Sequence, residues 1–251
     1  MLTLKTKNLN VRYMDCNVLK DINITLEAGR SYAIIGPSGE GKSTLLKSLD
    51  GLLDNRNATI TGEILLNDII VRDFNTLRQK EITYLLQDPS NQFNPVYTIG
   101  EQLDRAQKYS PSFCKEERKE RTLKALALMN LDKHVYHLYP NQLSGGMLQR
   151  ANIAIAFLQD KNILLLDEPT QGLDFKLENE LIEILINRKD KKNKITVFVT
   201  HSLSIAKKAD YIFFLYDGSI LEEGKPGDLF DDPQTDFLKK MLEASFYVKG
   251  N

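Results

Sequence analysis

Residues 36–44 read Gly-Pro-Ser-Gly-Glu-Gly-Lys-Ser-Thr, which fits the pattern GxxxxGK[ST] at Gly36, Gly41, Lys42 and Ser43. The apolar stretch Ser31–Ile35 before it predicts a strand, and a helix is expected from Lys42 to Asp50, ended by Gly51. Glycines let successive backbone N–H groups converge on phosphates, and the helix adds its positive N-terminal end. Lys42 can then reach the β- and γ-phosphates, and the Ser43 hydroxyl can reach Mg²⁺. The stretch therefore predicts a nucleoside triphosphate site.

An acidic pair follows a second apolar stretch, in residues 163–170 (ILLLDEPT). A buried strand that ends in Asp167 and Glu168 would place both carboxylates at the carboxyl edge of the sheet, where open α/β folds bind ligands. We expect Asp167 to hold Mg²⁺, directly or through water. Glu168 would polarise the water that attacks the γ-phosphate.

The rest of the chain alternates between strand and helix patterns. Short strands are expected over residues 2–35, a hairpin over 60–66 and 69–71, and strands at 163–166, 195–200 and 211–216. Residues 88–160 are rich in helix signals, with a helix over 115–129 capped by Ser110-Pro111-Ser112 and another over 141–159. Strands that alternate with helices predict an α/β fold with a mostly parallel sheet covered on both sides.

Composition narrows the class of protein. The 251 residues carry 33 Lys plus Arg against 34 Asp plus Glu, a net charge of −1, so bulk charge does not indicate a nucleic-acid partner. Cys16 and Cys114 lie far apart in the sequence and form no CxxC pair, so we expect two reduced cytosolic thiols rather than a disulfide framework. The N-terminus lacks a signal-peptide pattern, and the longest apolar runs have six residues. We expect a cytoplasmic chain whose link to a membrane, if it has one, runs through a partner.

A third motif points to one family. Residues 143–150 read LSGGMLQR, and Ser144 lies 57 residues after Gln87. With the phosphate loop and the acidic pair in this order, the chain resembles the ATP-binding subunits of ABC transporters over nearly its whole length. The resemblance implies that Ser144, Gly145, Gly146 and Gln149 contact ATP held by a second subunit. A serine and two glycines at a helix N-terminus suit close approach to a phosphate.

The resemblance also implies roles for further residues. ATP would contact Gly36, Pro37, Ser38, Gly39, Glu40, Gly41, Lys42, Ser43 and Thr44, with Tyr13 stacked on adenine and Gln87 near the γ-phosphate. Ser43, Gln87 and Asp167 would hold Mg²⁺. Glu168 and His201 would be catalytic, and Asp174 would lie at the dimer interface. Departures from the family pattern occur at Glu40, where a small residue is more usual, and at Gln171 and Gly172, where Ser and Ala are.

The family implies the architecture and the partners as well. The fold would be a P-loop NTPase (RecA-like) core with an N-terminal antiparallel β subdomain and an inserted α-helical subdomain. Residues 1–251 would form one ATPase domain, with the core in 1–87 and 161–251 and the helical subdomain in 88–160. Two such subunits would enclose ATP head to tail. They would bind two permease subunits at the cytoplasmic face of the membrane, with an extracytoplasmic substrate-binding protein acting indirectly.

Finer features favour a subgroup. Residues 87–103 (QDPSNQFNPVYTIGEQL) and 138–150 (LYPNQLSGGMLQR) resemble the ATPases of nickel and peptide importers. Nickel, a metal chelate and short peptides all remain compatible as cargo, and the second ATPase could be an identical or a different chain. The alternatives are ATPases of DNA maintenance or of ribosome-associated complexes. The first class needs a long coiled-coil insertion between Gln87 and Ser144, and the 57-residue stretch here, which contains several prolines, cannot supply one. The second class usually has two phosphate loops in one chain, whereas this chain has one.

Overall fold

The structure is a computed structural model that describes residues 1–54, 56–107, 113–190 and 193–247. Its strands are β1 (Thr3–Tyr13), β2 (Cys16–Ile22), β3 (Thr25–Glu27), β4 (Arg30–Ile35), β5 (Ala58–Leu66), β6 (Ile69–Ile70), β7 (Ile82–Leu85), β8 (Ile163–Asp167), β9 (Ile195–Val199), β10 (Tyr211–Tyr216) and β11 (Ser219–Gly224). Its α-helices are α1 (Lys42–Asp50), α2 (Phe74–Lys80), α3 (Ile99–Ala106), α4 (Lys115–Leu128), α5 (Gly145–Gln159), α6 (Phe175–Ile186), α7 (Leu203–Ala206), α8 (Pro226–Asp231) and α9 (Asp236–Tyr247). Short 3-10 helices are η1 (Pro89–Asn91), η2 (Lys133–His137), η3 (Pro140–Gln142) and η4 (Asn187–Asp190).

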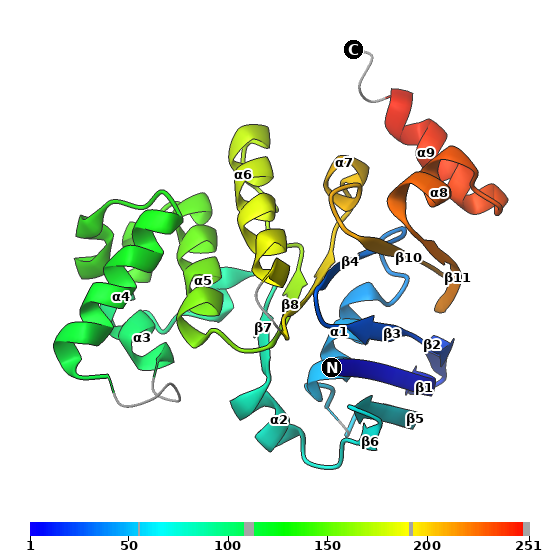
Figure 1. Cartoon of the computed structure of the whole chain (residues 1–251), viewed down its shortest axis with the longest axis horizontal. Helices are drawn as coiled ribbons and strands as arrows, with labels where there is room; N and C mark the ends of the chain where they lie inside the picture. Colours follow the sequence, from blue (N-terminus) through cyan, green and yellow to red (C-terminus); the bar gives the residue numbers. More distant parts are fainter. Residues whose placement is uncertain (55, 108–112, 191–192, 248–251) are drawn as a thin grey trace.

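A six-stranded sheet forms the centre of the molecule, in the order β11-β10-β4-β9-β8-β7 (Figure 1). Its neighbouring strands are parallel except for β11, which returns antiparallel to β10. Parallel strands need both faces covered, and β8 and β9 are accordingly buried along their whole length. The predicted α/β fold with a mostly parallel sheet is confirmed.

The two faces of this sheet belong to two separate cores, because side chains alternate along each strand. Ala33 and Ile35 of β4 pack with the helices α3 to α6, whereas Tyr32 and Ile34 pack with α1 and the N-terminal strands. The strand β8 divides in the same way. The sheet therefore joins a helical layer to a β layer and fixes the ends of β4, β8 and β9 between them.

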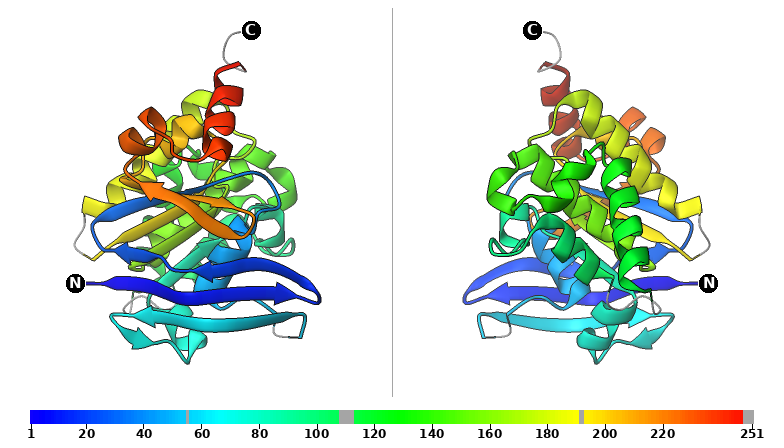
Figure 2. Two further views of the ribbon diagram at one scale, coloured as in Figure 1. Left: turned by 90° about the vertical axis from the view of Figure 1, so that its right-hand side faces the viewer. Right: turned by 90° about the vertical axis from the view of Figure 1, so that its left-hand side faces the viewer.

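The N-terminal strands form a second, antiparallel sheet in the order β2-β1-β5-β6, with β3 paired to β1. Its blue and cyan strands run along the bottom of both views in Figure 2. The predicted run of short strands differs in one respect: β1 continues from Thr3 to Tyr13 through an irregularity at Asn8, whose φ is 48°. Gly62 faces that point, because a Cβ there would lie 2.2 Å from the Asn8 carbonyl oxygen.

Residues 88–160 contain the helical layer of α3, α4 and α5, to the left in Figure 1. The predicted helix over 141–159 begins later, at Gly145, because Pro140–Gln142 form a separate 3-10 turn and Ser144 caps the helix. The helix over 115–129 ends at Leu128 and is capped by Cys114, whose Sγ accepts from the Glu117 N–H at 3.5 Å. The predicted capping turn, Ser110-Pro111-Ser112, lies outside the described residues.

The C-terminal helices α8 and α9 pack beside β10 and β11. The rings of Tyr216 and Phe237 stack with centroids 3.9 Å apart, and Leu238 and Leu242 are buried in the same core as the helical layer. Among the described helices, none has both the length and the hydropathy needed to cross a lipid bilayer.

Candidate functional site

The phosphate loop connects the end of β4 to the start of α1, in a backbone shape that only glycine accommodates at two positions. Gly36 has φ 149°, and a Cβ there would lie 2.1 Å from the Leu215 carbonyl oxygen of β10. Gly41 has φ 98°, and its Cβ would meet the Val18 carbonyl oxygen at 2.9 Å. The loop therefore packs closely against both β10 and β2, and it leads directly into the N-terminus of α1.

Lys42 is the cation of this loop. Its side chain folds back so that Nζ donates to the Gly36 carbonyl at 2.9 Å and to the Pro37 carbonyl at 2.5 Å. Burial lowers the pKa of this amine, and the negative charges of Glu168, Glu40 and Asp167 act in the opposite direction. A buried cation surrounded by loop carbonyls and N–H groups is suited to receive the negative oxygens of a polyphosphate.

The first acidic residue stands against the start of α1, because β8 ends beside it. The Ser43 hydroxyl donates to Asp167 Oδ1 at 2.9 Å, and the Tyr84 hydroxyl donates to Asp167 Oδ2 at 3.2 Å. Burial and the Asp167 charge raise the pKa of the Tyr84 phenol, so it stays protonated as a donor. A carboxylate and a hydroxyl side by side are hard oxygen donors, a set that fits Mg²⁺.

The second acidic residue lies just beyond the strand, in a strained conformation. Glu168 has φ 49°, a region that non-glycine residues rarely adopt, and its N–H donates to the Val199 carbonyl at 3.2 Å. The carboxylate contacts His201, which follows β9, through Oε1 and Nε2. Its other oxygen accepts from Gln87 Nε2 at 3.3 Å. Three segments distant in sequence thus converge on one carboxylate.

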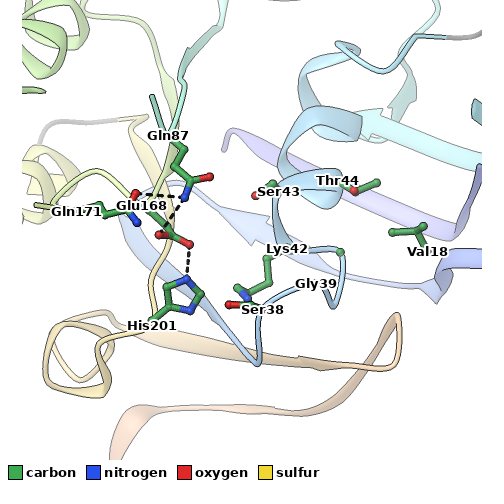
Figure 3. Close-up of a pocket in the computed structure, with 11 residues that line it drawn as sticks. Val18, Ser38, Gly39, Lys42, Ser43, Thr44, Gln87, Glu168, Gln171 and His201 are labelled. Atoms are coloured by element: carbon green, nitrogen blue, oxygen red, sulfur yellow. Dashed lines mark hydrogen bonds and ion pairs between the residues drawn. The ribbon is translucent and has the colours of Figure 1, made fainter. Parts of the chain in front are cut away.

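Several of these groups line one cavity of about 390 Å³ (Figure 3), whereas Asp167 and Tyr84 are not part of its lining. Nine of the predicted site residues line it, and so do two residues that the sequence did not single out for this role, Val18 and Gln171. Val18 carries no sequence signal, whereas Gln171 was noted only as a departure from the family pattern. The lining consists of Val18, Ser38, Gly39, Gly41, Lys42, Ser43, Thr44, Gln87, Glu168, Gln171 and His201.

Other predicted ATP contacts stand behind or beside this lining. Gly36 and Pro37 contribute their carbonyls to Lys42, and Tyr13 ends β1, paired with Cys16. The Glu40 carboxylate accepts from the Asp217 N–H in the turn between β10 and β11. Glu40 therefore ties the phosphate loop to a hairpin turn rather than facing the cavity.

The LSGG segment lies apart from the phosphate loop of its own chain. Ser144 Oγ accepts from the Met147 N–H at 3.3 Å as the cap of α5. Gly145, Gly146 and Gln149 line a second cavity of about 410 Å³, which Gln87 and Gln171 also line. A Cβ on Gly145 would meet nothing within 4 Å, so this backbone is open to an approaching group.

Asp174 caps α6. Its Oδ1 accepts from the Leu177 N–H at 3.0 Å, and the next residue, Phe175, has 67% of its surface exposed. Just before Asp174, Gln171 and Gly172 line the second cavity, and Gln171 also lines the first.

A phosphate loop, a hydroxyl–carboxylate pair and a carboxylate–histidine pair around one cavity define a P-loop nucleotide hydrolase. The family described as "ABC transporter" matches residues 19–171 of the sequence. The chain belongs to this family, as the LSGG segment indicated, and it is an ATPase.

The chain is similar over most of its length to transport ATP-binding proteins and to a solved ATP-binding cassette. The dipeptide transport ATP-binding protein DppD of Lactococcus lactis is 33% identical over 255 aligned residues, 96% of this chain and 73% of its own length. The oligopeptide transport ATP-binding protein OppD of Salmonella typhimurium is 33% identical, covering 92% of this chain and 71% of its own. The dimeric ATP-binding cassette MJ0796 bound to ADP and Pi matches with a TM-score of 0.81 and 31% identity, over 89% of this chain and 98% of that one.

Proposed function

We propose that this chain is the ATP-hydrolysing subunit that powers an importer of short peptides. The observation that carries the hydrolytic part is the meeting of Lys42, the Ser43–Asp167 pair and the Glu168–His201 pair around one cavity. The cargo is favoured by the relatives, which are named as transport proteins for dipeptides and oligopeptides. Nickel and metal chelates are the other cargoes that the sequence left open.

Each side chain has a place in the reaction. Lys42 and the loop N–H groups bind the β- and γ-phosphates, and Glu168 accepts the proton of the attacking water. His201 orients that carboxylate and donates toward the γ-phosphate region. Ser43, Asp167 and Gln87 would hold Mg²⁺, which when bound supplies positive charge against the phosphate oxygens.

A complete site needs a second ATPase subunit, identical or different. Gly145 and Gly146 line a different cavity from Lys42 and Ser43 in the same chain, and the backbone at Gly145 is open to an approaching group. ATP would therefore join the phosphate loop of one subunit to the Ser144 segment of another, and its hydrolysis would separate them. Residues 88–110, of which the structure describes 88–107, would transmit this movement to two permease subunits at the cytoplasmic face of the membrane. A substrate-binding protein would act from outside.

The hydrolytic assignment is tested with two variants of the full chain. Lys42→Ala is expected to weaken ATP binding by about 100-fold, because a buried charge-assisted contact to the phosphates is lost. His201→Ala should bind ATP within about twofold of wild type but lose about 100-fold in turnover. Nucleotide titration and phosphate release measure the two effects. Normal ATP affinity in Lys42→Ala would remove the phosphate-loop assignment.

The cargo is tested in cells. Uptake of labelled dipeptides, of longer peptides and of Ni²⁺ is compared between cells with the wild-type gene, cells without it and cells carrying Glu168→Gln. Peptide uptake that is lost in both mutants while Ni²⁺ uptake persists would support the proposal. Loss of Ni²⁺ uptake with normal peptide uptake would assign nickel instead.

A further inference from the structure

Gln171 is shared by three adjoining cavities. It lines the 390 Å³ phosphate cavity, the 410 Å³ cavity next to Gly145 and Gly146, and a third of about 220 Å³ beside Thr200, His201 and Ser202. Glu168 lines the first and third of these, and Gln87 lines the first and second. The Gln171 side chain therefore stands where the acidic pair, the segment after β7 and the start of α5 meet.

The hydrogen bonds of Gln87 give Gln171 a specific task. Gln87 Nε2 donates to Glu168 Oε2 at 3.3 Å and to Gln171 Oε1 at 3.2 Å. A carboxamide nitrogen carries two hydrogens, so these two acceptors use both donors and fix which end of the amide faces them. Figure 3 shows the carbonyl oxygen of Gln87 directed toward the side of the cavity where Ser43 lies.

Gln171 itself is held by its own loop. Its N–H donates to the Glu168 carbonyl at 3.2 Å, closing a turn over residues 168–171. Gln149 of α5 donates to the Pro169 carbonyl at 2.7 Å, and the Thr170 hydroxyl donates to Glu178 of α6 at 2.9 Å. These bonds hold the backbone of the turn, so the Gln171 side chain starts from a fixed Cα and its Oε1 can serve as an acceptor for the neighbouring amide.

We propose that Gln171 is a positioning residue that orients the Gln87 carboxamide, so that Gln87 presents its carbonyl oxygen to the divalent cation of the bound nucleotide. The proposal rests on the function proposed above, in which Gln87 is a cation ligand. In this role Gln171 acts through Gln87 and is not itself a ligand of the cation.

The test measures Mn²⁺ affinity, because Mn²⁺ replaces Mg²⁺ and is visible by electron paramagnetic resonance. The full chain is saturated with a non-hydrolysable ATP analogue and titrated with Mn²⁺ as wild type, Gln171→Met, Gln87→Met and the double variant. Methionine keeps the length of the side chain and removes its hydrogen-bonding groups. Gln79→Met, an exposed glutamine on α2, serves as the matched control.

Gln171→Met is expected to weaken Mn²⁺ binding by roughly tenfold, the size typical of outer partners of a metal ligand. Affinity for the analogue in EDTA should stay unchanged, and the double variant should bind Mn²⁺ no more weakly than Gln87→Met alone. Gln171→Glu, which keeps an acceptor, should recover most of the loss.

Two results would overturn the inference: wild-type Mn²⁺ affinity in Gln171→Met, or additive losses in the double variant. Wild-type ATP hydrolysis in Glu168→Gln, or unchanged Mn²⁺ affinity in Gln87→Met, would instead contradict the proposed site. The two failures are therefore distinguishable.

Discussion

Glu40 is expected to have two opposite effects on ATP binding, one through its hydrogen bond and one through its charge. Its carboxylate sits in the phosphate loop and accepts from the Asp217 N–H, and its negative charge acts on Lys42, the cation that the phosphates need. Asp217 in turn pairs with Lys20 of β2 at 2.8 Å. The hydrogen bond orders the loop, whereas the charge repels a polyanion.

Glu40→Gln separates these two effects, because it keeps the acceptor and removes the charge. We expect ATP to bind roughly three- to tenfold more tightly, since one like charge near the triphosphate is gone. The gain should shrink at high salt, where exposed charges are screened. Isothermal titration at two ionic strengths measures both effects, with Glu63→Gln on β5 as the control. Weaker binding in Glu40→Gln would show that the charge itself supports the loop.

Asn152 on α5 is a second residue whose side chain is expected to lower the stability of the fold. It is fully buried, and neither its side-chain nitrogen nor its side-chain oxygen has a hydrogen-bond partner among the residues that the structure describes. A buried amide without partners costs about 1–3 kcal/mol. Asn152→Leu, which has a similar branched shape, should raise the free energy of unfolding by about 1 kcal/mol in urea titrations. Asn152→Asp should lower it, because a charge would be buried at the same place.

At the scale of elements, the sequence predicted those site residues whose identity is required by the local backbone. The glycines of the phosphate loop and the carboxylates after β8 are set by local backbone needs, so their places followed from the sequence. The ends of helices were harder to predict. α4 begins at Lys115 as predicted, but its cap is Cys114, and the helix predicted from Asn141 begins only at Gly145, after the cap Ser144. Val18 and the Gln171–Gln87 hydrogen bond depend on which segments pack together, and no local pattern carries that information.

The C-terminal end of α1 contains a buried acid outside the nucleotide cavity. Asp50 is 2% exposed, and burial raises the pKa of its carboxyl to about 7, although Arg78 and Lys161 act in the opposite direction. Arg78 also donates to the Asp50 and Gly51 carbonyls at 2.9 Å, which closes the end of α1 against α2. The C-terminal end of α1 is therefore held by Arg78, next to the Asp50 carboxyl, whose raised pKa favours the protonated form.

The raised pKa of Asp50 has a defined sign for stability. The folded chain holds this proton up to about pH 7, whereas the unfolded chain releases it near the ordinary value of 3.8. The contribution of Asp50 to stability is thus fully present below pH 4 and is lost as pH rises through 7. Asp50→Asn should be roughly 2–4 kcal/mol more stable than wild type at pH 8 and similar to it at pH 4. Urea titrations at the two pH values measure this, with exposed Asp15→Asn as the control; an equal difference at both would contradict it.

At the scale of the whole molecule, the phosphate loop and the LSGG segment line two different cavities that adjoin at Gln87 and Gln171. Lys42 and Glu168 line one cavity, while Gly145 and Gly146 line the other. In the proposed arrangement, a single chain would present two incomplete halves of the ATP site. Two chains placed head to tail would complete both, and the related cassette MJ0796 is a dimer with ADP and Pi.

Glu168→Gln tests this arrangement, because the variant keeps the shape of the side chain but cannot accept the proton of the attacking water. ATP that is bound and not hydrolysed should hold two chains together, so light scattering after size exclusion should give the mass of two chains with Mg-ATP and of one chain with Mg-ADP. Adding Ser144→Arg should abolish the dimer while ATP binding persists, since the bulky cation would block the approach of the second phosphate loop. A dimer that persists in this double variant would contradict the head-to-tail geometry. A Glu168→Gln chain that binds ATP and stays single would show that the second half-site comes from a different ATPase chain, and mixing with that chain should then restore the ATP-dependent doubling.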